Sequence, residues 1–303
     1  MLPLFSGDAE RVLAFARRAE ERGFDGVFAF DHLFPPGAPA ERPSLEAFAS
    51  LTAVAAQTSR VAVGTLVTRA TLRAPGMLAK IAASIDDVSG GRMILGIGTG
   101  DPIDELEHRV FGIEYLGKAE RREHLVETVR SIKALYGGVR WEGGSYVPAM
   151  TGPLLPPPVR PGGPPIWIGG FADAVVRLAA AEADAWNGWG MGVEEFTRKV
   201  RLLREAAGER FESLEINVYP TGTPPMVTDS ARKTAADVLD GIRARTGTDV
   251  TVDEFLESPH VFIGSVDGLV AKFTELRERL GISSFMTGDV QTLAPVVERL
   301  AGR

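Results

Sequence analysis

The sequence predicts an α/β protein built as one parallel (β/α)8 barrel, the TIM-barrel architecture, with insertions. Eight short apolar segments alternate with amphipathic helical segments, and this alternation is typical of parallel βα units. No change in composition divides the 303 residues, and α/β barrels of about this length commonly form one domain. Two stretches interrupt the pattern. We expect proline-rich residues 139–165 to be an ordered excursion and residues 229–260 a helical insertion, both near the active-site face.

The elements follow from local patterns. Residues 1–5 suggest the end of a first strand, and Asp8 is suited to cap a helix that Gly23 ends. Residues 27–30 are apolar on both faces, which is typical of a central strand. Pro75 suits the first turn of a helix. The other expected strands are residues 61–67, the strand that opens the stretch 92–101, and residues 166–168, 183–187, 214–219 and 283–286. The other expected helices begin at Ser44 or cover residues 118–136, 172–183, 265–280 and 293–300, with one more through Phe196 and Leu203.

The stretch Arg92–Asp101 is central to the prediction. Apolar residues 93–95 lead into Gly96, Gly98 and Gly100. Such glycines allow a ligand to lie against bare backbone. They also occur where a strand simply packs closely on its neighbours, and the motif alone does not distinguish the two interpretations.

Ligands of (β/α)8 barrels bind at the carboxyl ends of the strands. Five predicted strands end in segments that carry glycine, polar or aromatic residues, so we expect these segments to converge on one site. They are Asp31 with His32, residues 66–69, residues 98–101, residues 169–171 and residues 186–189.

Composition excludes several classes of function. The net charge is −7 and the sequence pI is about 5.3, without a basic stripe, so nucleic acid is not an expected partner. The absence of cysteine excludes disulfides, thiolate nucleophiles and zinc–thiolate sites. No apolar run is long enough to cross a membrane, and the cytoplasm is the default location. His108, His124 and His260 fall in helices or loops, where we expect them at the surface.

The residues that remain favour a bound cofactor. All lysines fall in helical segments, so a Schiff base at a strand end is not expected. Asp31, Asp101 and Asp104 could bind a divalent ion, but their glycine-rich neighbours favour a bulkier ligand, and we expect no metal. Without an obvious nucleophile, a cofactor would carry the chemistry. Gly169 and Gly170 precede a helix, whose first amides suit a phosphate; the alternative is that they only allow a tight turn from strand to helix. Trp167 and Phe171 beside them would suit a ring system.

Four motifs resemble the bacterial-luciferase-like superfamily of flavin- and deazaflavin-dependent oxidoreductases. They span residues 23–32, 89–101, 165–170 and 183–187, with matching spacing, so the resemblance covers nearly the whole chain. It implies an insertion-bearing barrel, usually a homodimer, that binds FMN or coenzyme F420 and acts on a small molecule. The Gly-Thr-Gly-acid loop at residues 98–101 looks more like the deazaflavin branch.

The resemblance also implies roles for individual residues. Thr99, Asp101 and Asp104 would lie near the ring, Asp104 where the branch often has asparagine. The Leu66–Val67 bond would be a non-proline cis peptide behind the ring, and Gly169 and Gly170 would receive the cofactor phosphate, beside Trp167, Ile168 and Phe171. His32, next to Asp31, would handle the proton that accompanies hydride transfer; the alternative is that His32 only hydrogen-bonds a neighbouring loop. The remaining substrate-side candidates are Arg69, Arg73, Trp186 and Trp189.

Three departures from the sugar-phosphate dehydrogenases of this branch qualify the prediction. Pro36 stands where those enzymes have tryptophan, no strand end carries a lysine, and the first strand is shorter. Glucose 6-phosphate is therefore not the expected substrate. We expect hydride transfer between F420 and a small carbonyl, alcohol or unsaturated compound. The alternatives are an FMN-dependent monooxygenase served by a separate reductase and a non-catalytic flavin-binding relative.

Overall fold

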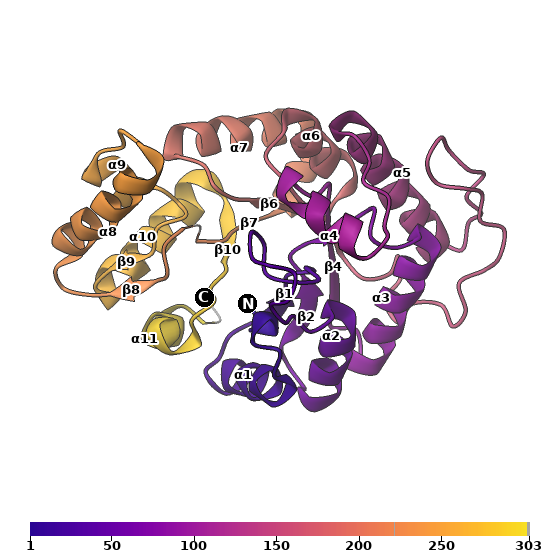
Figure 1. Ribbon diagram of the computed structural model, residues 1–303, viewed down its shortest axis with the longest axis horizontal. Coiled ribbons are helices and arrows are strands. Elements are labelled where there is room, and N and C mark those ends of the chain that lie inside the picture. The colour runs from indigo at the N-terminus through magenta and orange to yellow at the C-terminus, as the bar shows by residue number, and fades with distance from the viewer. Residues whose placement is uncertain (221, 302–303) are drawn as a thin grey trace. The chain divides into compact units, whose positions relative to one another are not determined.

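The computed structural model describes residues 1–220 and 222–301, and the chain divides into two compact units. The first unit contains Met1–Gly169 and Glu182–Asp184, and the second contains Gly170–Ala181 and Ala185–Arg303. Each unit shows the predicted alternation of parallel strands and helices (Figure 1). The expectation that the whole chain forms one domain stays a prediction.

The first unit is built on a parallel sheet in the order β1-β2-β4-β5, and short β3 pairs with β4. In register, Val27 lies opposite Val63 and Leu95 opposite Ile166. Because the strands are parallel, all their carboxyl ends lie at the same edge. The strands are β1 (Gly26–Ala29), β2 (Ala62–Thr65), β3 (Thr68–Arg69), β4 (Met93–Gly98) and β5 (Ile166–Gly169); the helices are η1 (Leu4–Ser6), α1 (Ala9–Glu21), α2 (Ala47–Gln57), α3 (Pro75–Ser89), η2 (Pro102–Asp104), α4 (Glu105–Val110) and α5 (Lys118–Tyr136).

The second unit contains the parallel order β6-β7-β10 and a separate ribbon of β8 with β9. Sequence patterns did not predict this ribbon, because two-residue strands are too short to show a period. The strands are β6 (Ala185–Gly188), β7 (Glu215–Val218), β8 (Met226–Val227), β9 (Ile263–Gly264) and β10 (Ile282–Phe285); the helices are α6 (Asp173–Glu182), α7 (Val193–Ala207), η3 (Gly208–Ser213), α8 (Ala231–Thr246), α9 (Val252–Glu257), α10 (Val266–Leu280) and α11 (Val290–Leu300).

Residues 1–5 correct the prediction of a first strand. Leu2 donates one backbone hydrogen bond to the Phe28 carbonyl of β1, over 2.7 Å, but the chain then turns into the 3-10 helix η1. Pro3 has no N–H to continue a ladder. The Ser6 hydroxyl donates to the Pro3 carbonyl and closes the turn instead.

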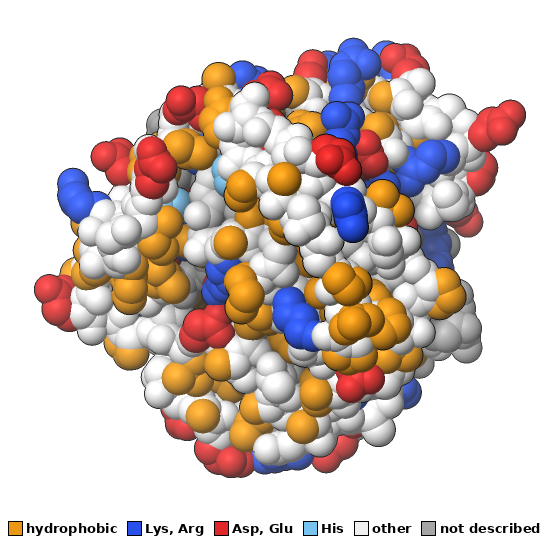
Figure 2. Space-filling view, turned by 90° about the vertical axis from the view of Figure 1, so that its right-hand side faces the viewer, with side chains coloured by type: hydrophobic (Ala, Val, Ile, Leu, Met, Phe, Trp, Pro, Cys, Tyr) orange, Lys and Arg blue, Asp and Glu red, His pale blue; other side chains and the backbone are white. Residues whose placement is uncertain are grey.

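The excursion of residues 139–165 follows the outer helices α3 and α5. The Glu127 carboxylate of α5 accepts hydrogen bonds from the backbone N–H groups of residues 145–147. Arg160 pairs with Asp86 of α3 and donates to the Met93 carbonyl at the amino end of β4. These contacts fix the excursion on α3, α5 and the amino end of β4, and its predicted place near the active-site face stays a prediction. Figure 2 views the molecule from this side, where hydrophobic side chains form several patches among charged ones.

The insertion of residues 229–260 is helical, as predicted, and consists of α8 and α9. Ala235, Val261 and Ile263 form a small core with apolar side chains of both helices. Because the insertion follows β7 in the chain, it leaves the sheet of the second unit from the carboxyl end of that strand.

Candidate active site

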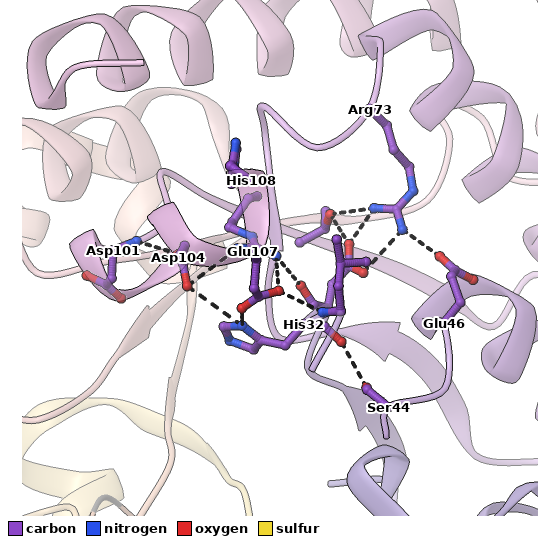
Figure 3. A network of polar contacts seen from close by, with 12 residues as sticks. His32, Ser44, Glu46, Arg73, Asp101, Asp104, Glu107 and His108 are labelled. Atoms are coloured by element: carbon purple, nitrogen blue, oxygen red, sulfur yellow. Dashed lines mark hydrogen bonds and ion pairs between the residues drawn. The ribbon is translucent and has the colours of Figure 1, made fainter. Parts of the chain in front are cut away.

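Polar side chains gather at the carboxyl ends of β1, β3 and β4 in the first unit (Figure 3). His32 follows β1, and Arg69 ends β3. The bond between Leu66 and Val67, between β2 and β3, is a non-proline cis peptide, as the resemblance predicted. Helix α4 follows the glycine loop of β4 and brings Glu107 to this group, so short segments of three strands and one helix build the cluster.

His32 contacts a buried carboxylate. Its Nδ1 lies 2.7 Å from Oε1 of Glu107, whose side chain is 1% exposed. Oε2 of Glu107 accepts from the Leu33 backbone N–H (2.7 Å) and from Arg69 Nη2 (2.8 Å). Burial raises the pKa of the Glu107 carboxyl, but the hydrogen bonds from His32 and Leu33 and the charge of Arg69 outweigh it, so the pKa lies below its ordinary value. Glu107 is therefore an ionised acceptor at neutral pH.

Asp104 supplies a second buried carboxylate. Its Oδ2 accepts from the Asp101 backbone N–H over 2.6 Å, and its Oδ1 lies 3.4 Å from Arg69 Nη1 and 3.7 Å from His32 Nδ1. Burial, and then the charge of Asp104, raise the pKa of the Asp101 carboxyl. The predicted residues Asp101 and Asp104 therefore do lie together beside His32.

Asp31 is occupied by protein partners. The Thr68 hydroxyl donates to it over 2.6 Å, and both terminal nitrogens of Arg73 contact its carboxylate. Arg73 also pairs with Glu46 and lies over the Phe48 ring. These contacts show that Asp31 holds this loop, and its predicted catalytic role stays a prediction.

The two arginines of this region, Arg69 and Arg73, both contact carboxylates of the protein. Arg69 is 4% exposed and directs its terminal nitrogens to Glu107, Asp104 and the Asp31 carbonyl. Arg73 faces Asp31 and Glu46. Since both guanidinium groups are engaged by carboxylates of the protein, neither is a free cation for an anionic ligand, and their place on the substrate side stays a prediction.

The glycines of the central stretch are explained by close packing. A Cβ on Gly96 would lie 2.1 Å from the Thr65 carbonyl oxygen, and one on Gly98 would lie 2.8 Å from a Val67 methyl. Gly100 has a φ of +73°, and a Cβ there would meet Arg69 and Asp104 at 2.9 Å. Of the two interpretations left open by the sequence, close packing accounts for these three positions. Thr99 is half-buried beside them, and its hydroxyl donates to the Gly100 carbonyl.

Several residues that were predicted to contact the cofactor have their side chains buried in the core. Leu66 and Ile168 are buried, and Trp167 is buried and stacks on Phe28 with ring centroids 4.9 Å apart. In the second unit Trp186 is fully buried, and its indole N–H donates to the Gly170 carbonyl over 2.8 Å. Trp186 therefore packs in the core of this unit, and its place on the substrate side stays a prediction.

The turn into α6 carries the predicted phosphate site. Gly170 has a φ of +144°, a conformation that favours glycine. Its N–H donates to the Asn187 carbonyl, which corrects the expectation that this amide receives a phosphate. Phe171 is exposed and meets Trp189 edge to face at 5.5 Å. The convergence of these residues with those of the first unit stays a prediction.

The second unit also contains a cavity of about 340 Å³. It lies at the carboxyl ends of β7 and β10, where Tyr219, Thr223 and Asp289 line it together with prolines. Asp289 is engaged at the start of α11, because its carboxylate accepts from residues 291 and 292. Within the described part of the chain the lining includes neither lysine nor arginine.

A metal ion is not required to explain the cluster. Ligand atoms of His32, Asp104 and Glu107 lie within 4.8 Å of one another. Arg69 contacts both carboxylates, however, and already supplies the positive charge that a metal would provide. The donor set therefore fits an internal ion-pair network better than a cation site.

Sequence reasoning missed Glu107 and misplaced two histidines. Asp101, Asp104 and Glu107 are spaced by three residues, which places them on one side of a helical turn, and this spacing was the available signal. His108 and His260 are buried rather than at the surface. Their Nδ1 atoms contact the Glu114 and Tyr219 carbonyls, at 2.8 and 3.0 Å. His124 is half-buried.

Comparison with known proteins places the chain in a family. The profile of the luciferase-like monooxygenase family matches residues 5–284. The chain belongs to this family. A curated relative, the F420-dependent glucose-6-phosphate dehydrogenase of Nakamurella multipartita, is 37% identical over 175 residues, which are 55% of this chain and 48% of the relative. The chain thus spans about half the length of that curated relative.

Solved structures confirm the predicted fold class. An F420-dependent secondary alcohol dehydrogenase, solved with an F420–acetone adduct, has a TM-score of 0.76 at 20% identity, covering 97% of this chain and 95% of that one. The EDTA monooxygenase of Chelativorans sp. BNC1 has a TM-score of 0.75 at 16% identity, covering 96% and 87%. At these identities the likeness concerns the fold alone. Within the described residues, no helix is long and apolar enough to span a bilayer.

Proposed function

We propose that this protein is an F420-dependent oxidoreductase that transfers a hydride between the deazaflavin and a small, uncharged carbonyl, alcohol or unsaturated substrate. The observation that carries the proposal is His32. Its ring is 21% exposed at the carboxyl edge of the sheet, and its inner nitrogen is bound to a buried carboxylate. A histidine so placed is suited to exchange a proton at its outer nitrogen. The curated relatives that are named F420-dependent dehydrogenases support the choice of cofactor.

The residues present fit a deazaflavin. Val67 of the cis bond, Thr99 and Asp101 are half-buried at the same strand ends as His32, and they would hold the ring. Within the second unit, the first amides of α6, after Gly170, are our proposal for a phosphate site. When bound, F420 supplies a ring carbon that accepts or gives a hydride.

His32 manages the proton in either direction. For alcohol oxidation, Nε2 takes the hydroxyl proton as the hydride leaves the carbon; for carbonyl reduction, it returns a proton to the oxygen. The rings of Phe5 and Phe30 lie 6.3 and 6.5 Å from the imidazole by centroids, so His32 has two aromatic neighbours. General acid–base catalysis of this kind typically contributes about 10²–10⁴-fold to the rate.

The charges near the strand ends favour an uncharged substrate. A sugar phosphate needs cations, but Arg69 and Arg73 are engaged by internal carboxylates. The cavity beside Thr223 has prolines and a hydroxyl instead of basic groups in its described lining. We therefore propose a substrate different from the glucose 6-phosphate named for the curated relatives. We also keep the homodimer and the cytoplasmic location as proposals.

The second candidate is an FMN-dependent monooxygenase served by a separate reductase. It is favoured by the match of residues 5–284 to the luciferase-like monooxygenase family. His32 would then lie near the oxygen-reactive face of the flavin.

Equilibrium binding of F420 and FMN, followed by turnover on a panel of secondary alcohols, aldehydes and enones, tests the proposal. We expect micromolar binding of F420, weaker binding of FMN and substrate-dependent change in deazaflavin absorbance. His32→Ala should retain F420 binding and lose about 10²-fold or more in kcat. Micromolar FMN binding without F420 binding would overturn the proposal in favour of the monooxygenase. F420 binding without turnover in either protein would indicate a non-catalytic relative.

A further inference from the structure

We propose that Glu107 is a positioning residue that holds His32 in the tautomer with the proton on Nδ1, so that Nε2 keeps its lone pair for the substrate proton. The catalytic consequence rests on the proposed function. The tautomer itself is a property of the protein without ligand, so it can be tested independently.

The two carboxylate oxygens of Glu107 have different partners. Oε2 receives the Leu33 backbone N–H and Arg69 Nη2, at 2.7 and 2.8 Å. An amide N–H and a guanidinium can only donate, so this oxygen must be an acceptor. Oε1 faces His32 Nδ1 at 2.7 Å. Because an ionised carboxylate has no proton to offer, Nδ1 must donate this hydrogen bond.

The charged groups around the His32 imidazole also favour a proton on Nδ1. Asp104 Oδ1, from η2, lies 3.7 Å from the same Nδ1 and also only accepts when ionised. Asp101, from the preceding loop, adds a third acid whose field reaches His32. Arg69, from β3, contacts both Asp104 and Glu107 and neutralises part of that field, and the charge of Arg121, from α5, acts on Asp101. Two close acceptors therefore favour a proton on Nδ1.

Burial makes the arrangement rigid. The side chains of Glu107, Asp104 and Arg69 are 1%, 3% and 4% exposed. Breaking one of these pairs would leave an uncompensated charge out of water, which is costly. On the other side of the ring, Nε2 makes no hydrogen bond with any residue that the structure describes. One nitrogen is thus fixed by the protein while the other is left for the substrate.

Glu107→Gln offers a sharp test because it should invert the tautomer. Glutamine has one acceptor oxygen, and the donors from Leu33 and Arg69 require it at the Oε2 position. Its NH₂ group then faces Nδ1 and donates, so Nδ1 becomes the acceptor and the proton moves to Nε2. Glu105→Gln is the matched control, since Glu105 is an exposed residue of the same helix.

The measurement is long-range ¹H–¹⁵N correlation NMR of ¹⁵N-histidine protein without cofactor, at a pH where His32 is neutral. His32→Ala identifies the His32 signals by their loss. We expect the Nδ1–H pattern in the wild type and in Glu105→Gln, and the Nε2–H pattern in Glu107→Gln. An Nε2–H pattern in the wild type would overturn the inference whatever the variant does. An unchanged pattern in a folded Glu107→Gln protein would overturn it as well.

Kinetics with F420 then measure the consequence. Glu107→Gln should lower kcat by about 10²–10⁴-fold, as a wrong tautomer does in a comparable triad, with little change in KM and a displaced acid limb of the pH profile. Glu105→Gln should behave as the wild type. If the tautomers follow the prediction but the wild type does not turn over F420, the proposed function fails and the positioning inference stands.

Discussion

At the scale of single residues, close backbone contact explains positions that otherwise look like parts of a ligand site. Gly64 and Gly96 face each other's strands, so that added Cβ atoms would lie 2.6 and 2.1 Å from the carbonyl oxygens of Ile94 and Thr65. The Thr65 hydroxyl meanwhile exchanges hydrogen bonds with the Gly96 backbone, over 2.8 and 3.0 Å. The spacing of β2 and β4 is therefore set by small residues rather than by a ligand.

Substitution of Gly96 tests this explanation. In Gly96→Ala the new methyl group would meet backbone that cannot swing aside as a flexible side chain can, so we expect a loss of about 3 kcal/mol or more in urea unfolding. Gly241→Ala is the control, because Gly241 lies within α8 with no atom within 4 Å of an added Cβ. The control should gain about 0.5–1 kcal/mol. Equal stability of the two variants would contradict the explanation.

At the scale of elements, sequence periodicity predicted the strands and helices that depend on local sequence patterns. The Val27–Phe30 and Arg92–Asp101 segments became β1 and β4, and all six lysines lie in helices, as expected. Glu107 was missed because its partners are 38 and 75 residues away at Arg69 and His32, and no local period reports such contacts. The burial of Trp186 was not predicted for a related reason, since a strand end in sequence does not show whether its side chain faces the core.

The excursion illustrates how one side chain can fix an irregular element. Glu127→Ala removes the acceptor for three backbone N–H groups at residues 145–147. We expect amide hydrogen exchange there to accelerate about 10-fold or more, because the segment has no strand ladder to replace these bonds. Glu123→Ala, at an exposed position of the same helix α5, serves as the control. Unchanged exchange in Glu127→Ala would show that the excursion is held by other contacts.

At the scale of the whole molecule, stability should depend on two kinds of buried titrating group. Glu107 has a lowered pKa, so its contribution is present above the ordinary glutamate value of 4.5 and is lost as the pH falls further. His260 affects stability in a higher pH range. Burial, together with the nearby Lys272, lowers the pKa of its imidazole from 6.5 to about 4, although the hydrogen bond to the Tyr219 carbonyl opposes the shift. The two pH ranges therefore overlap only between about pH 4.5 and 4.

The lowered pKa of His260 determines how much stability changes with pH in the upper range, and in which direction. Between pH 6.5 and 4 the unfolded chain binds a proton at this position that the folded chain refuses, so stability falls as the pH falls. At about 1.4 kcal/mol per pKa unit, the loss approaches about 3 kcal/mol and reaches about 2 kcal/mol by pH 5. Its Nε2 atom is buried without a partner among the described residues, so no acceptor there stabilises the protonated ring.

His260→Asn tests this dependence. The asparagine amide can still donate to the Tyr219 carbonyl but does not titrate. We expect the variant to be less stable than the wild type at pH 7, because the smaller side chain leaves a cavity. In urea unfolding, the difference in unfolding free energy between the wild type and His260→Asn should be about 2 kcal/mol smaller at pH 5 than at pH 7. The reason is that the unfolded wild-type chain binds a proton at His260 that the folded chain refuses, whereas the variant has no titrating group there. His124→Asn, at a half-buried position, should show a smaller change because burial also lowers the pKa of that imidazole, but to a lesser extent. A difference between wild type and His260→Asn that is equal at both pH values would contradict a buried neutral His260.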